Sequence, residues 1–138
     1  MTTTPCYLTV LSRLTKTQIA KLAPMLESLV PDDSDVAEAV EENSVIRFEA
    51  IFEGDMPAEL LHWFHTNEVS FTWEWEAYYG VGAGCNYFDA EAGEMHHIRL
   101  HETLAVISVA EAIDPEKVKK LRTVMNAITQ KRKDVGLT

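Results

Sequence analysis

Residues 69–79 read Val-Ser-Phe-Thr-Trp-Glu-Trp-Glu-Ala-Tyr-Tyr and are the strongest structural signal in the chain. Apolar and polar residues alternate along this stretch, which is the period of a strand with one buried and one exposed face. Aromatic side chains bury roughly 150–250 Å² each, so three of them on one face would supply much of a small domain's core. We therefore expect a central antiparallel strand. Its buried face would consist of Val69, Phe71, Trp73, Trp75, Ala77 and Tyr79.

The aromatic face has a second interpretation, as an exposed platform on which bases or sugars stack. Glu74 and Glu76 occupy intervening positions of the same strand. Their carboxylates would repel the phosphates of a nucleic acid, which disfavours that interpretation. The two carboxylates would also lie roughly 7 Å apart on one face, within the range of paired glycosidase carboxylates, but consecutive acids on the wet face of a strand are common.

Helices are predicted by their start and stop signals. Thr15 and Gln18 have the spacing of a capping box and open a helix over 15–30, which Pro24 would either kink or split. A second helix is expected over 57–67, with Asp55 as its cap and Pro57 in its first turn. A third begins at Asp114, Pro115 and Glu116, carries an apolar stripe and runs to about Lys133. Residues 35–43 fit a short helix or an acidic edge strand, and we favour the helix.

Further strands are expected over 6–14, 44–52, 85–89, 94–101 and 104–113, although the last could be helical on its composition. Two strand-then-helix units, a meander from Val69 onward and a terminal helix predict a single α+β domain over residues 1–138. Its sheet would be mainly antiparallel, with about five or six strands, helices packed mostly on one face and a C-terminal amphipathic helix. The other face would carry Glu49, Thr72, Glu74 and Glu76 and would be the acidic surface if it is open to water.

Composition and charge narrow the class of protein. With 138 residues, 46% hydrophobic and 25% charged, the chain has the balance of one soluble globular domain. It has no apolar run of about 18 residues and no secretory signal at its start, so we expect a cytoplasmic protein without a membrane segment. In that compartment Cys6 and Cys85 would be reduced, buried thiols.

The net charge of −10 is concentrated in the middle of the sequence. Residues 31–95 contain sixteen acidic residues and a single basic one, Arg47, whereas residues 96–138 contain eight basic and five acidic ones. Such a field disfavours direct binding to nucleic acid and suits a basic protein partner. The basic residues of the last helix could instead meet the acidic region of a second copy, which would give a homodimer.

From these features we predict a non-enzymatic interaction protein that docks on a basic protein or nucleoprotein complex. Its acids would occupy the positions of phosphates on a nucleic-acid-binding partner, as in phage and mobile-element inhibitors of restriction or CRISPR machinery. Aromatic anchors would add to the contact, with Trp63 and Tyr87 as further candidates. The predicted partner-binding residues are Glu38, Glu41, Glu42, Glu49, Glu74, Glu76, Tyr78 and Tyr79.

Two rival functions remain open. A small metal-dependent or ligand-binding enzyme would use His62, His65, one of His96, His97 or His101, and Cys85. If His96 and His97 lie on a strand they point to opposite faces, which already divides this set. The run Gly80-x-Gly82-x-x-Cys85 lacks the third glycine of a dinucleotide fingerprint, so no cofactor is predicted. The other rival is a structural subunit of a larger assembly.

Overall fold

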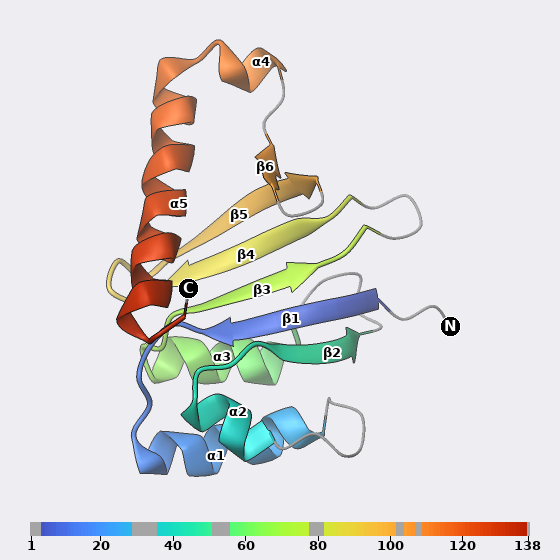
Figure 1. The fold of residues 1–138 in the computed structure, drawn as a ribbon, viewed down its shortest axis with the longest axis vertical. Coiled ribbons are helices and arrows are strands. Elements are labelled where there is room, and N and C mark those ends of the chain that lie inside the picture. The colour runs from blue at the N-terminus through green and yellow to red at the C-terminus, as the bar shows by residue number, and fades with distance from the viewer. Residues whose placement is uncertain are drawn as a thin grey trace.

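The computed structural model describes residues 4–28, 36–50, 56–77, 82–101, 104–106 and 109–137. Six strands form one antiparallel sheet in the order β2-β1-β3-β4-β5-β6 (Figure 1). The strands are β1 Thr4–Val10, β2 Ile46–Ala50, β3 Phe71–Trp75, β4 Gly84–Asp89, β5 Glu94–His101 and β6 Leu104–Val106. The helices are α1 Lys16–Glu27, α2 Val36–Glu41, α3 Ala58–Thr66, α4 Val109–Ala112 and α5 Pro115–Asp134. The predicted α+β class, the antiparallel sheet and the C-terminal helix are confirmed.

The aromatic strand lies near the middle of the sheet, as the alternation predicts. Trp73 has a register partner on each side, Leu8 of β1 and Asn86 of β4. From β3 onward each strand pairs with the next one in the sequence, so the predicted meander is confirmed. Trp73 and Phe71 are almost completely buried, at 1% and 0% exposure, because both neighbouring strands and a layer of helices enclose them.

One face of the sheet is covered by α1, α2 and α3. The aromatic residues of β3 pack there with Leu22 and Leu26 of α1, Val36 and Val40 of α2, and Phe64 of α3. The ring centroids of Phe64 and Phe71 are 4.4 Å apart, and those of Phe71 and Phe88 are 5.8 Å apart. Aromatic burial of this extent is the main source of stability that the fold offers.

The opposite face carries α5, which runs across the strands (Figure 1). Val124 and Ile128 of this helix pack on Cys85, Tyr87 and Ile98 in a second, smaller core. At the end of the helix, Lys131 Nζ lies 3.6 Å from Glu91 Oε1 in the turn between β4 and β5. The second face is therefore covered where α5 crosses the sheet, because the helix buries its apolar stripe there, and the condition for an open acidic face is not met at that place.

Local signals in the sequence explain where the helices begin. Thr15 and Gln18 form both hydrogen bonds of the predicted capping box, and α1 continues through Pro24 as one helix rather than two. The Asp114 side chain accepts a hydrogen bond from Glu116 N, with Pro115 in the first position of α5. Pro57 is the N-cap residue of α3 rather than a member of its first turn, and Asp55 lies outside the described residues.

Two predicted elements differ from the observed ones. The central strand ends at Trp75, and Ala77, which we expected to be buried, is exposed. The predicted strand over 104–113 is divided into β6 and α4, so its apolar run contributes to both an edge strand and a short helix. Apolar runs without clear periodicity fit either structure, which is why composition did not separate the two.

Glycine packing explains part of the stretch between β3 and β4. Gly84 is the register partner of Trp75, and a Cβ atom added to Gly84 would lie only 2.4 Å from Cζ2 of the indole ring. The same ring donates a hydrogen bond from Nε1 to Gly82 O at 3.1 Å. Gly84, the first residue of β4, is therefore a site of close packing. Among the described residues, no helix combines the length and the apolar character needed to cross a membrane.

Candidate interaction surfaces

The acids predicted to bind a partner lie in two separate places, which the sequence alone did not decide. Glu38, Glu41 and Glu42 belong to or directly follow α2, on the helix layer that covers one face of the sheet. Glu74 is on β3, and its register partners Tyr7 and Cys85 place it on the opposite face, with α5. The sheet therefore stands between the two groups. A single patch that contains all the predicted acids is not formed.

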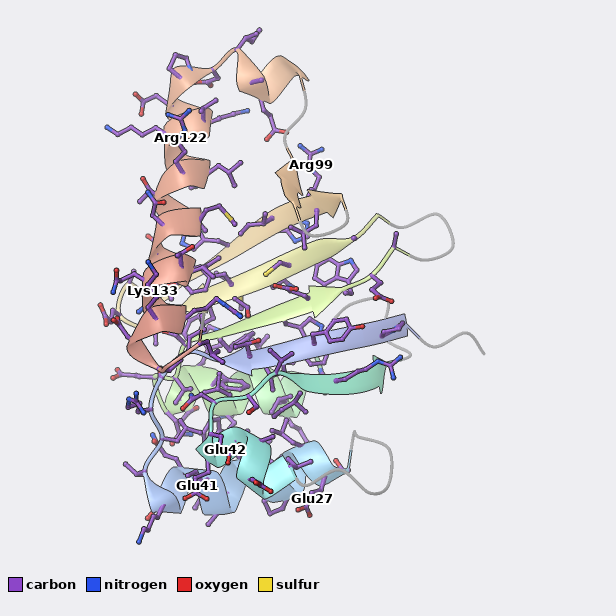
Figure 2. The ribbon with its side chains drawn as sticks, viewed as in Figure 1. Glu27, Glu41, Glu42, Arg99, Arg122 and Lys133 are labelled. Carbon is purple, nitrogen blue, oxygen red and sulfur yellow. The ribbon has the colours of Figure 1, made fainter. Side chains whose placement is uncertain are left out.

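The α2 group is joined by Glu27, the last residue of α1, because α1 and α2 pack against each other. Figure 2 shows Glu27, Glu41 and Glu42 at the same end of the molecule. All four carboxylate side chains are exposed. We call the surface formed by Glu27, Glu38, Glu41 and Glu42 the acidic helix surface. Lys16 and Lys21 lie in the first half of α1, so the surface is confined to the last turn of that helix and to α2.

The Glu74 carboxylate is only partly exposed and sits in a different environment. Burial raises its pKa, and the charge of Arg132 on α5 offsets this in part. Cys85 lies beside it as its register partner. Burial, followed by the charge of Glu74, raises the pKa of the Cys85 thiol to about 12. The thiol is thus neutral at physiological pH, which is the condition of a structural cysteine rather than of a nucleophile.

Cys85 and Cys6 are both buried and neither forms a disulfide, as predicted for reduced thiols. Cys6 belongs to the core beneath α1, α2 and α3, whereas Cys85 belongs to the core beneath α5. The sheet separates the two sulfur atoms, so a disulfide between them would require the fold to open.

The other predicted contact residues are placed as follows. Glu76 is exposed just after β3 and accepts a hydrogen bond from Tyr7 Oη at 3.1 Å. Glu49 is in β2 opposite Pro5, but its side chain is outside the described part of the structure, as are Tyr78 and Tyr79. Two other aromatic anchors were predicted wrongly. Trp63 and Tyr87 are 8% and 1% exposed, because both side chains face a core rather than solvent.

The histidines are distributed over both faces of the sheet. His65 on α3 packs against Phe88, with ring centroids 4.2 Å apart, and His62 lies one turn earlier with its Nε2 3.3 Å from Thr66 Oγ1. His97 stacks on Trp75 and His96 stacks on Tyr87, so these neighbours point to opposite faces, as predicted.

The set proposed for a metal site is divided by this arrangement. Cys85 is on the α5 face, away from His62 and His65, and the His101 side chain lies outside the described residues. Within the described ranges, no three histidine, cysteine or acidic side chains are grouped so that they could hold a metal ion.

Two buried hydroxyl groups lie beneath α5. Thr72 and Tyr87 are register partners on β3 and β4, exposed by 2% and 1%, and neither hydroxyl oxygen has a hydrogen-bond partner among the described residues. Burial, together with the nearby charges of Asp89 and Glu91, raises the pKa of Tyr87. An unsatisfied buried hydroxyl costs free energy, so these two groups weaken the second core relative to an apolar pair of the same shape.

Basic side chains gather on the opposite part of the molecule from the acidic helix surface. Figure 2 places Arg122 and Lys133 on α5 and Arg99 on β5, away from Glu27, Glu41 and Glu42. The charge segregation along the sequence is thus preserved in space for these residues. Periodicity did not show it, because the direction in which α5 crosses the sheet is a tertiary property. The signal that pointed to it was the run of lysines and arginines in the last helix.

Comparison with protein families, with curated proteins and with solved structures found no significant match. Arguments about function therefore rest on the residues and geometry of this chain.

Proposed function

We propose that this chain is a non-enzymatic protein-interaction module that docks on a basic surface of a partner protein through its acidic helix surface. The observation that carries the proposal is the position of four exposed carboxylates on α1 and α2, remote from the basic residues of α5 (Figure 2). Charge of one sign gathered on one part of a surface steers a partner of the opposite sign and orients it on encounter.

The helix geometry of α2 favours a partner whose basic groups are closely spaced. Glu38 lies three residues before Glu41 and four before Glu42, so each pair is adjacent on the helix surface, with about 5–6 Å between Cβ atoms. A rigid row of carboxylates can occupy sites that otherwise receive phosphates. The finer proposal is thus a basic nucleic-acid-binding protein or nucleoprotein complex as the partner, which this chain inhibits by competing with DNA or RNA.

The experiment is affinity capture on the tagged chain from a host lysate at low and at high salt, with mass spectrometry of the retained proteins. A specific partner should be a basic nucleic-acid-binding protein that elutes with salt and is displaced by added DNA or RNA. The double variant Glu41→Gln/Glu42→Gln should retain much less of it. The matched control is Glu59→Gln/Glu68→Gln, which removes two exposed charges from α3 and its end.

Three outcomes would contradict the proposal. Equal retention of the partner by both double variants would place the contact elsewhere on the molecule. Retention that nucleic acid does not displace would overturn the phosphate-mimicry part alone. Oligomers of the purified chain that persist at high salt would favour a structural subunit, because an apolar interface is not screened.

A further inference from the structure

A second surface, independent of the acidic helix surface, lies at the edge of the sheet next to α5. In the part of the chain that the structure describes, β6 has three residues, which pair with Arg99, Leu100 and His101 of β5. Among the described residues, nothing pairs with the outer edge of β5 from Glu94 to Ile98. This open segment of five residues is about 17 Å long.

The backbone of this segment offers hydrogen-bonding groups to a partner. Leu100 N bonds to Ala83 O, so the polar backbone groups of Leu100 point toward β4. These groups alternate between the two edges along a strand, so those of Ile98 and His96 also point inward and those of His97 and Met95 point outward. Two N–H and two C=O groups are therefore presented at the open edge, in the arrangement that a further strand requires.

A groove of about 460 Å³ runs along the same edge. Its floor is the open segment of β5, and its wall is the first half of α5, with Lys117, Lys120, Leu121 and Val124. Figure 1 shows why the groove exists, since the first half of α5 extends beyond β5. A strand added to β5 would lie under this part of the helix and extend the second core, because Leu121 already packs partly against that core.

The charge of the groove specifies the occupant. Lys117 and Lys120 are exposed on the wall, and the acid that lines the groove, Glu111, is paired with Arg99. The groove is thus locally positive on a chain whose net charge is −10. A second copy that paired through its own β5 would bring the same lysines of two α5 helices together, and like charges would oppose that contact.

We propose that this groove binds an extended peptide segment of a partner by strand addition to β5, and that the side chains which the segment turns toward α5, at every second position, are alternately apolar and acidic. Apolar side chains of the peptide contact Leu121 and Val124, and its carboxylates reach Lys117 and Lys120. Backbone hydrogen bonds to Met95 and His97 supply the sequence-independent part of the affinity. The chain thereby has one acidic and one basic contact surface, on different elements.

The test uses the isotope-labelled full chain and synthetic heptapeptides. In the first peptide the odd-numbered positions are alternately valine and glutamate and the even-numbered positions are threonine, and in the second peptide lysine replaces glutamate. We expect the first peptide, but not the second, to shift the amide resonances of Met95 and His97. Two further analogues of the first peptide carry methyl groups on the backbone nitrogens of the odd-numbered residues or on those of the threonines. Since only one edge of an added strand faces β5, one of these analogues should lose binding and the other should keep it.

Variants of the chain locate the contact. Lys117→Glu/Lys120→Glu should weaken binding of the glutamate peptide by roughly ten-fold or more and confer binding of the lysine peptide. The matched control is Lys16→Glu/Lys21→Glu on α1, which makes the same change in net charge and should leave the affinity unaltered. Met95→Pro should abolish binding while the melting temperature changes little, because proline is tolerated at a free strand edge.

Several results would overturn the proposal. Peptide-induced shifts that map to α1 and α2, or no shifts at all, would remove the groove as a binding site. Retained binding by both methylated analogues would exclude strand addition. Shifts at Met95 and His97 that depend on protein concentration without any peptide would show that a second copy occupies the edge instead.

Discussion

The replacement Gly84→Ala tests the close packing at the centre of the sheet. The new Cβ atom would lie 2.4, 2.9 and 3.0 Å from three atoms of the Trp75 ring. Carbon atoms in ordinary contact are about 3.5–4.0 Å apart, so the ring must retreat by roughly 1 Å. It is held in place by the hydrogen bond to Gly82 and by stacking on His97, with ring centroids 5.6 Å apart. Overpacking of this kind costs about 1–3 kcal/mol.

Gly82→Ala is the matched control, because no atom of the described residues lies within 4 Å of a Cβ atom at that position. Both substitutions reduce the freedom of the unfolded chain and should gain about 0.4–1 kcal/mol from that source. This gain is common to the two variants and cancels when they are compared. The difference between their free energies of unfolding therefore isolates the steric cost at Gly84, which we expect to be about 1–3 kcal/mol.

Urea denaturation followed by tryptophan fluorescence and by circular dichroism measures both variants. Gly84→Ala should have a lower midpoint than Gly82→Ala with an unchanged slope, because the surface exposed on unfolding is the same. A smaller ring in the double variant Gly84→Ala/Trp75→Phe should recover part of the loss, which a double-mutant cycle would report as coupling. Equal stabilities of Gly84→Ala and Gly82→Ala would refute the argument that Trp75 packs on the Gly84 backbone.

Three further predictions concern buried polar and ionisable side chains. Because burial raises the pKa of Glu74, protonation of this carboxyl favours the folded state, and that stability is lost as pH rises through its folded-state pKa. Glu74→Gln should thus be more stable than the unaltered chain at pH 7, and denaturation at several pH values should show that the difference shrinks as pH falls. At pH 8 the two cysteines should not react with a thiol reagent until denaturant is added, because both are buried and burial raises the pKa of Cys85 to about 12. Prompt labelling of Cys6 or Cys85 in the native chain would contradict this prediction. Tyr87→Phe should leave the melting temperature unchanged or raise it, because the lost hydroxyl has no partner among the described residues, and a clear drop would reveal a hydrogen bond to Tyr87 Oη.

Local sequence patterns were sufficient for most of the elements. The capping box at Thr15, the proline at the start of α5 and the alternation around Trp73 are interactions between residues close in the chain, so they were predictable without a tertiary context. The sequence predicted the first and last residues of the elements less accurately. β3 ends at Trp75 although the alternation continues to Tyr79, because the strand ends where its pairing with β1 and β4 ends.

The candidate surfaces needed the tertiary structure. The sequence placed an acidic excess in residues 31–95, but the order of strands and the side on which α2 packs separated Glu41 and Glu42 from Glu74. Trp63 and Tyr87 could not be recognised as core residues from the sequence, because an aromatic side chain can pack in a core or contact a binding partner equally well. The groove beside β5 could not be predicted from the sequence, because its position depends on where β6 ends and where α5 crosses the sheet.

What the amino-acid sequence alone determined is the set of elements, the α+β class and the segregation of charge along the chain. These follow from periodicity, capping and composition, which act over a few residues. The tertiary structure alone decided which face each element covers, which acids meet, how Trp75 packs on Gly84 and which strand edge has no neighbour among the described residues. Those properties follow from strand order and helix packing, which join residues far apart in the chain and leave no local trace in the sequence.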